Sequence, residues 1–242
     1  MKTCFGRLLP LLLLTPYICA YVPNPDGDEE YSIAIAAGRG VYADVSRDCN
    51  GNITSIENHK YEDVAVQFAG RYDVLKYGVT GGRTSALQPR NDWESAPATG
   101  PIVYGAPKVG LSTTIVGADI GLLFSLNGNL ISTDRRAGRS AHPTFGIRVG
   151  KMSALHFSGG YLNNFPIVSG GGVYDAGLGG PVGSSNLSQI WFGVGAQPYD
   201  QAVLSFKGDF WLSDHISINP ALHGSLGDTG EFGGAVGVRF SF

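Results

Sequence analysis

Strict alternation of apolar and polar residues, repeated along most of the chain, is the feature that most constrains this fold. It is clearest in the final segment, where the residues fall on two faces: Phe232, Gly234, Val236, Val238, Phe240 and Phe242 on one, and Gly233, Ala235, Gly237, Arg239 and Ser241 on the other. A period of two is typical of a β-strand. Helices are disfavoured, because 36 of the 242 residues are glycine, and each helical glycine costs about 1 kcal/mol relative to alanine. The pattern predicts an all-β protein.

Twelve segments follow this pattern, which predicts strands over about 31–44, 62–72, 74–84, 102–112, 115–126, 143–151, 155–163, 171–179, 188–197, 201–211, 215–224 and 232–242. Short turns alternate with long polar loops at 46–60, 85–101 and 127–141, which is typical of up-and-down hairpins with two unlike rims. The first and eighth segments are the weakest, because Arg39 would face outward in the first and glycines crowd the eighth. Ten or eight strands therefore remain alternatives to twelve.

The N-terminus has the three parts of a secretory signal. Lys2 and Arg7 precede an apolar run at 8–14, and the small residue Ala20 ends the segment. We expect cleavage after Ala20, so that 1–20 is a signal peptide, 21–30 an acidic periplasmic leader and 31–242 the barrel. Cleavage would leave Cys49 as the sole cysteine, and the fold must then hold without an internal disulfide.

Charge is sparse, and we expect it to be confined to one face of the strands. Charged residues make up 15% of the chain and the net charge is −3, so the basic footprint of a nucleic-acid-binding protein is absent. One face is apolar in nearly every strand, with aromatic residues near the strand ends, as in a wall that faces lipid. The other face carries nine charged residues that would line a lumen: Asp63, Arg71, Lys76, Lys108, Asp119, Arg148, Lys207, Asp209 and Arg239. These features predict a closed antiparallel transmembrane β-barrel.

The chain ends on two aromatic residues of the lipid-facing register, Phe240 and Phe242. This ending resembles the C-terminal signature strand of bacterial outer-membrane β-barrel proteins. The resemblance covers the signal peptide, the hairpin pattern and the last eleven residues, and it identifies the superclass without a subfamily. It implies residence in the bacterial outer membrane, contact with outer-membrane lipid and recognition of the last strand by the barrel-assembly machinery, with Phe240 and Phe242 as the assembly signal.

Two hypotheses follow for the lumen charges. Acids and bases interleave across neighbouring strands, so they can form a salt-bridged filling, because buried charges need partners. They can also line a small pore, which Lys76, Lys108, Arg148 and Arg239 would bias toward anions. Glycines fall mainly on the lumen face, which favours a narrow barrel. We therefore expect a non-enzymatic structural barrel or narrow small-solute channel; the alternative is a surface-interaction protein that acts through its long loops.

Two short motifs offer chemistry. His156 and Ser158 share the lumen face, which is the minimum for nucleophilic catalysis, and the H-x-S pattern resembles that of outer-membrane lipid A deacylases. The pattern recurs at His215 and Ser217, no carboxylate completes a triad, and the short-turn rim should be periplasmic. A lipid-modifying hydrolase is therefore the weaker hypothesis.

The second motif, residues 48–52, has oxygen ligands at alternate positions, like a calcium loop. It lacks the required glycine and glutamate, since Ile53 and His59 stand in their places. A loop-tip turn is the better interpretation of these residues. Neither a metal nor a cofactor is predicted.

Overall fold

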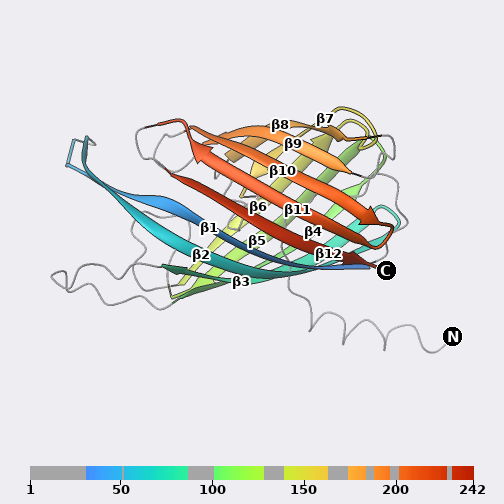
Figure 1. Cartoon of the computed structure of the whole chain (residues 1–242), viewed down its shortest axis with the longest axis horizontal. Helices are drawn as coiled ribbons and strands as arrows, with labels where there is room; N and C mark the ends of the chain where they lie inside the picture. The colour runs from blue at the N-terminus through green and yellow to red at the C-terminus, as the bar shows by residue number, and fades with distance from the viewer. Residues whose placement is uncertain are drawn as a thin grey trace.

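Twelve antiparallel strands close into a barrel in which each strand pairs with its neighbours in sequence and β1 pairs with β12 (Figure 1). The computed structural model describes residues 31–50, 52–86, 101–127, 139–162, 174–183, 188–196, 202–227 and 231–242. The strands are β1 Tyr31–Arg47, β2 Ile53–Tyr72, β3 Leu75–Ala86, β4 Ile102–Ser112, β5 Val116–Leu126, β6 Arg139–Val149, β7 His156–Tyr161, β8 Tyr174–Pro181, β9 Gln189–Ala196, β10 Ala202–Ser213, β11 Ile216–Ser225 and β12 Phe232–Ser241.

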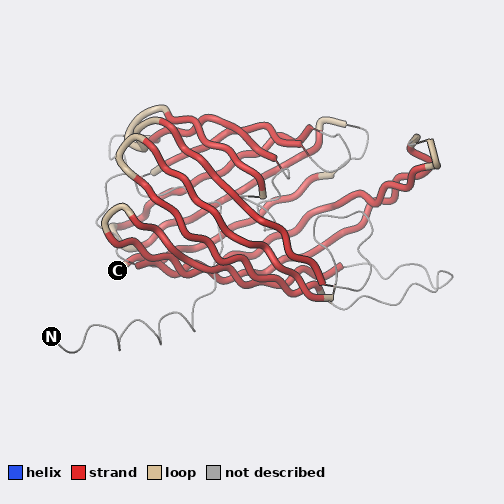
Figure 2. Tube along the Cα trace, turned by 180° about the vertical axis from the view of Figure 1, so that it is seen from behind, coloured by secondary structure: helices blue, strands red, loops and turns tan. Residues whose placement is uncertain are grey.

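The prediction of a closed barrel of twelve strands is confirmed, and the alternatives of ten or eight are wrong. The eighth segment forms a strand in spite of its glycines, because β8 pairs along its whole length with β9. The short turns gather at one rim, where the C-terminus also lies (Figure 2). No helix in the described part of the chain is long and apolar enough to cross a membrane.

The predicted loop at 46–60 is wrong in its extent. β1 continues to Arg47 and β2 begins at Ile53, so the two strands form a hairpin that projects beyond the rest of the barrel (Figure 2). The backbone pairing of β1 with β2 continues into this ribbon, from Val41 opposite Lys60 to Arg47 opposite Ile53. The alternation used for prediction fails here because a projecting ribbon has no lipid on either face. β6 likewise begins at Arg139, inside the loop predicted at 127–141.

Several predictions lie outside the described residues. They are the signal peptide at 1–20, the leader at 21–30 and most of the loops at 85–101 and 127–141.

The outer wall is apolar along most of its height. Large exposed hydrophobic side chains occur on all twelve strands and include Ile35, Val64, Val66, Leu75, Val109, Ile120, Ile147, Phe157, Leu178, Val194, Leu204, Leu222 and Val236. Aromatic side chains mark the short-turn rim, where Tyr72, Phe240 and Phe242 are exposed. An apolar wall with an aromatic edge is the surface that a barrel presents to a bilayer.

Aromatic rings lie across glycines on neighbouring strands, and this accounts for many of the glycines. Six glycines stand directly opposite an aromatic or histidine residue whose ring occupies the space that a Cβ would need: Gly40 with Tyr61, Gly70 with Tyr77, Gly82 with Tyr104, Gly105 with Phe124, Gly179 with His156 and Gly233 with His223. Such rings cover the bare backbone of the glycine and help to fix the strand register. Two of these pairs face lipid, so close ring packing, as well as narrowness of the lumen, explains the glycine content.

The register fixes the width of the barrel. The stagger is found by tracing from each residue to its paired residue on the next strand, once around the barrel. Starting at Tyr61 on β2 and passing through β1 and β12, this path returns to β2 near Tyr72. This displacement of about twelve residues in twelve strands tilts the strands by about 35–40° and gives a backbone radius of about 10 Å. Inward side chains from opposite walls can therefore meet.

Candidate functional site: the charged lumen

Every one of the nine predicted lumen residues lies on the inward face of its strand. Five of them are buried: Asp63, Arg148, Lys207, Asp209 and Arg239. The other four are partly exposed: Arg71, Lys76, Lys108 and Asp119. The strand parity that separates lipid-facing from lumen-facing positions therefore holds around the whole barrel.

The most deeply buried ion pair joins β10 to β12. Arg239 Nη1 lies 2.8 Å from Asp209 Oδ2, and both side chains are 1% exposed. Asn219 on the intervening strand β11 donates from Nδ2 to Asp209 Oδ1 at 2.7 Å. The Arg239 guanidinium also lies over the ring of Trp211, with 5.9 Å between its Cζ and the ring centroid. Both oxygens of this carboxylate thus have a donor, as a buried charge requires.

Two further ion pairs face each other across the lumen. Lys207 Nζ on β10 lies 3.5 Å from Asp175 Oδ2 on β8 and 4.3 Å from the Trp191 ring centroid. Lys108 Nζ on β4 lies 3.9 Å from Asp119 Oδ1 on β5. Lys108 is also within electrostatic range of Asp175 and Lys207, which lie four and six strands away around the barrel. We call Lys108, Asp119, Asp175 and Lys207 the central cluster.

Arg148 belongs to the short-turn rim. Its guanidinium donates to Ser112 Oγ at 3.2 Å, to the Thr113 carbonyl at 2.8 Å and to the Gly150 carbonyl. It therefore ties the β4–β5 turn to the β6–β7 turn. Arg71 is also a rim residue, since its Nε donates to the Asp73 carbonyl at 2.7 Å.

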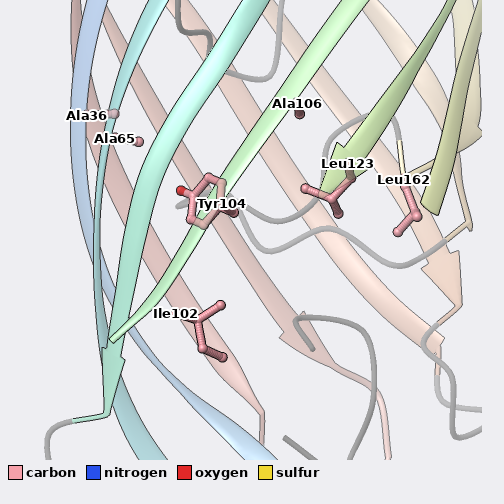
Figure 3. Packing of buried hydrophobic residues seen from close by; sticks show 7 residues of the cluster. All are labelled: Ala36, Ala65, Ile102, Tyr104, Ala106, Leu123 and Leu162. Carbon is pink, nitrogen blue, oxygen red and sulfur yellow. The ribbon is translucent and has the colours of Figure 1, made fainter. Parts of the chain in front are cut away.

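The long-loop half of the lumen is apolar in part, which the sequence analysis missed. Buried hydrophobic side chains pack there into one cluster (Figure 3): Ala36, Ala65, Ile102, Tyr104, Ala106, Leu123 and Leu162. Tyr104 donates its hydroxyl to both oxygens of Asp63, at 3.0 and 3.2 Å. The run Leu122-Leu123-Phe124 was the available signal, because three consecutive apolar residues in a strand place one of them inside.

At both H-x-S motifs the histidine lies beside a backbone carbonyl. His156 Nδ1 lies 3.2 Å from the Ala154 carbonyl, and the ring packs against Gly179. His215 Nδ1 lies 3.1 Å from the Ser241 carbonyl at the rim. Within the described ranges, no three His, Cys, Asp or Glu side chains are arranged to hold a metal ion.

The Asp48 carboxylate serves the tip of the β1–β2 hairpin. It accepts hydrogen bonds from the backbone N–H groups of Asn50 and Asn52, both at 2.8 Å, and from Asn52 Nδ2 at 3.0 Å. Both oxygens of the first residue that a calcium loop would offer are thus engaged in a turn.

The comparisons with known proteins rest on shape. No protein-family model matches the sequence, and no curated protein is similar to it. The translocator domain of the autotransporter NalP from Neisseria meningitidis is similar in structure, with a TM-score of 0.53 at 11% identity over 90% of each chain. An outer membrane channel from Pseudomonas putida F1 has a TM-score of 0.49 at 10% identity, and it covers 90% of this chain and 98% of its own. Outer membrane phospholipase A from Escherichia coli has a TM-score of 0.43 at 12% identity, covering 87% and 92%.

The similarity to the NalP translocator domain concerns topology and reaches across most of the chain, in agreement with the apolar wall and the charged interior. It assigns the protein the fold of an outer-membrane β-barrel.

Proposed function

We propose that the protein is an integral outer-membrane barrel without enzymatic activity, whose lumen is narrowed at mid-height by the central cluster and passes only small solutes. The observation that carries the proposal is the burial of inward-facing charges: the Lys207 and Asp175 side chains are only 4% and 2% exposed, so little open space lies beside them. A backbone radius of about 10 Å leaves little further room once such side chains fill the lumen.

A narrow hydrated path beside the central cluster is also supported. Buried side-chain atoms of Gln67, Thr144 and Ser205 form no hydrogen bond within the described part of the chain. Buried polar atoms ordinarily have partners, and water or a passing polar solute would supply them. Mixed charge in the cluster favours small polar solutes over apolar ones.

Single-channel recording in planar bilayers tests this proposal. We expect small or no conductance from the unaltered protein. The double variant Asp175→Asn/Lys207→Gln should raise conductance, because it removes the buried ion pair that joins Lys207 on β10 to Asp175 on β8 inside the lumen. The outward pair Arg39→Gln/Glu62→Gln is the matched control and should leave conductance unchanged. A large conductance that is the same in all three proteins would refute a lumen narrowed by the central cluster.

The absence of enzymatic activity is tested separately. Purified protein in mixed micelles should release no fatty acid from phospholipid or lipid A. Release that Ser158→Ala abolishes would contradict this part of the proposal and would support the hydrolase hypothesis.

A second candidate function is attachment to other surfaces, and the projecting β1–β2 hairpin favours it. Among the residues that the structure describes, the two strands beyond Val41 and Tyr61 pair with each other and not with β12 or β3. Their outer edges therefore present backbone donors and acceptors that a partner strand can use. Cells that carry the protein should lose adhesion when residues 43–57 are replaced by a short turn, and unchanged adhesion would exclude this role.

A further inference from the structure

Charged side chains interrupt the apolar outer wall of β1, β2 and β3 close to the long-loop end. Arg39 on β1, Lys60 and Glu62 on β2 and Arg83 on β3 occupy outward-facing positions of their strands. Arg39 is 78% exposed and Glu62 36% exposed at the side chain. We call these four residues the outer-wall cluster. Arg39 is unexpected in a lipid-facing strand, and the structure gives it charged neighbours.

The register places the two arginines at one level. Arg39 stands opposite Glu62 and forms an ion pair with it, while Arg83 stands opposite Val64, the next outward residue of β2. Because the strands tilt, each residue lies about 3 Å nearer the long-loop end than its paired residue on the preceding strand, going from β1 to β3. Val64 lies two residues nearer the short-turn rim than Glu62, and this difference cancels the rise over the two strands. Arg39 and Arg83 therefore lie at similar height, about 10 Å apart around the wall, with Glu62 between them and slightly higher.

The depth of the cluster coincides with the edge of a bilayer. On β2, ten residues separate Glu62 from Tyr72, which is exposed at the short-turn rim. At about 3.3 Å per residue and a tilt of 35–40°, this separation corresponds to about 26 Å along the barrel axis. The apolar band of such barrels is about 25 Å tall. On β2 the outward side chains between the two levels include Val64, Val66 and Phe68, so the cluster begins where the apolar side chains of this strand end.

The charge of the cluster selects an anion. Three cations and one carboxylate give a net charge of +2. Arg39 remains mostly exposed in spite of its ion pair, so most of its five N–H donors point away from Glu62. Guanidinium groups bind phosphate through paired N–H donors more readily than ammonium groups do. A phosphate at the boundary of the bilayer, between Arg39 and Arg83, fits this arrangement.

We propose that the outer-wall cluster binds the phosphate of a phosphorylated glycolipid in the outer leaflet. The inference rests on the proposed insertion in the outer membrane, with the chain termini on the periplasmic side and the long-loop end outward. Arg39 and Arg83 hold the phosphate from two sides, and Lys60 adds attraction above them. Glu62 orients Arg39 and weakens anion binding by its own charge.

Native mass spectrometry of the full chain in detergent micelles tests the site, with bisphosphorylated lipid A and dephosphorylated lipid A as probes. We expect the unaltered protein to retain the bisphosphorylated form selectively. Arg39→Gln/Arg83→Gln should weaken retention by about tenfold or more, since each basic residue at an anionic membrane surface contributes about fivefold in affinity. Lys151→Gln, on an exposed turn of the short-turn rim, removes a positive charge far from the cluster and should retain lipid A normally.

Glu62→Gln gives the sharper result, because it should strengthen retention several-fold, whereas a purely structural role of Glu62 predicts a loss. Equal retention of both lipid A forms, an equal loss in Lys151→Gln, or stronger retention of phosphatidylglycerol than of lipid A would each overturn the proposal. Heat-modifiable gel mobility is recorded for every variant. A protein that shows no such mobility and stays soluble without detergent would refute the proposed function instead, so the two failures are distinguishable.

Discussion

Arg239 and Asp209 form a pair in which neither partner can be removed alone without leaving a charge buried. Both side chains are 1% exposed, and Asn219 completes the coordination of the carboxylate. Breaking a buried pair on one side costs much more than replacing both partners, because the remaining charge keeps its desolvation penalty and loses its attraction. This pair is therefore where a single substitution in the lumen should be most damaging.

We expect Asp209→Ala to lower the free energy of unfolding by about 3–5 kcal/mol. The double variant Asp209→Ala/Arg239→Met should recover part of that loss, because it removes the second charge as well. Urea titration of the refolded protein in micelles, followed by tryptophan fluorescence, measures both values. Glu62→Gln, which alters an exposed pair on the outer wall, should cost less than about 1 kcal/mol. Equal costs for Asp209→Ala and Glu62→Gln would contradict the assigned difference between buried and exposed pairs.

For single residues, the sequence predicted which face of the strand a side chain lies on better than it predicted the residue with which that side chain pairs. Strand parity placed Lys207 and Asp209 inside, because one residue in two must face the lumen. It could not pair Lys207 with Asp175, since pairing across β8, β9 and β10 depends on the stagger of three strands. Asp175 was also missed because it lies in a glycine-rich segment whose alternation is weak. Leu123 was missed because an apolar side chain inside the lumen breaks the polar pattern expected there.

At the scale of the strands, aromatic rings that pack over glycines hold neighbouring strands together. Tyr104 on β4 lies across Gly82 on β3 and reaches Asp63 on β2, so one ring connects three strands. A methyl group at Gly82 would overlap the Tyr104 hydroxyl and displace it from Asp63. The strand register and the buried hydrogen bond between Tyr104 and Asp63 thus both depend on the absence of a side chain at Gly82.

Gly82→Ala should therefore lower the free energy of unfolding by about 1–3 kcal/mol, the usual cost of overpacking. Gly224→Ala is the matched control, because the nearest atom to its Cβ would be the Glu231 carbonyl oxygen at 3.9 Å. Urea titration in micelles compares the two variants, and the control should change stability by less than about 0.5 kcal/mol. If both variants unfold at the same urea concentration, ring packing over Gly82 is not a source of stability.

The β1–β2 hairpin is the element that sequence patterning described least well. Its polar outer part was predicted as a loop, because period-two alternation arises only where one face of a strand meets an apolar environment and the other a polar one. A projecting ribbon lacks this difference between its faces. Its backbone pairing is nevertheless continuous, and Asp48 caps the tip through three hydrogen bonds.

Asp48→Ala should loosen the projecting ribbon and leave the barrel intact. Amide hydrogen exchange should become faster at 43–58, because the tip loses the bonds that hold its turn, while protection in β10 and β11 stays the same. Exchange followed by mass spectrometry on the refolded protein measures this difference. Faster exchange in β10 and β11 as well would mean that the hairpin tip stabilises the barrel itself.

The closure of the whole barrel depends on its two chain-terminal strands. Tyr31 and Phe242 exchange backbone hydrogen bonds of 3.3 and 3.0 Å, and their rings stack with centroids 6.3 Å apart. Phe242 is therefore both the last residue of the lipid-facing register and part of the seam between β1 and β12. The sequence predicted it as an assembly signal on the basis of the C-terminal pattern, but only the register shows that it also closes the barrel.

Two roles of Phe242 can be separated by comparing cells with micelles. If the assembly machinery recognises Phe242, Phe242→Ala should lower the amount of heat-modifiable protein in the outer membrane of cells several-fold. Refolding of the same variant in micelles should still give the heat-modifiable form. Its free energy of unfolding should be lower by about 1 kcal/mol, because the ring contact with Tyr31 is lost. Phe232→Ala removes a similarly exposed ring from the opposite end of β12, 60% exposed against 63% for Phe242, and should assemble normally in cells. Equal losses for the two variants in cells would mean that any exposed ring on β12 serves assembly. A loss of Phe242→Ala in micelles as severe as in cells would instead assign its effect to closure of the seam.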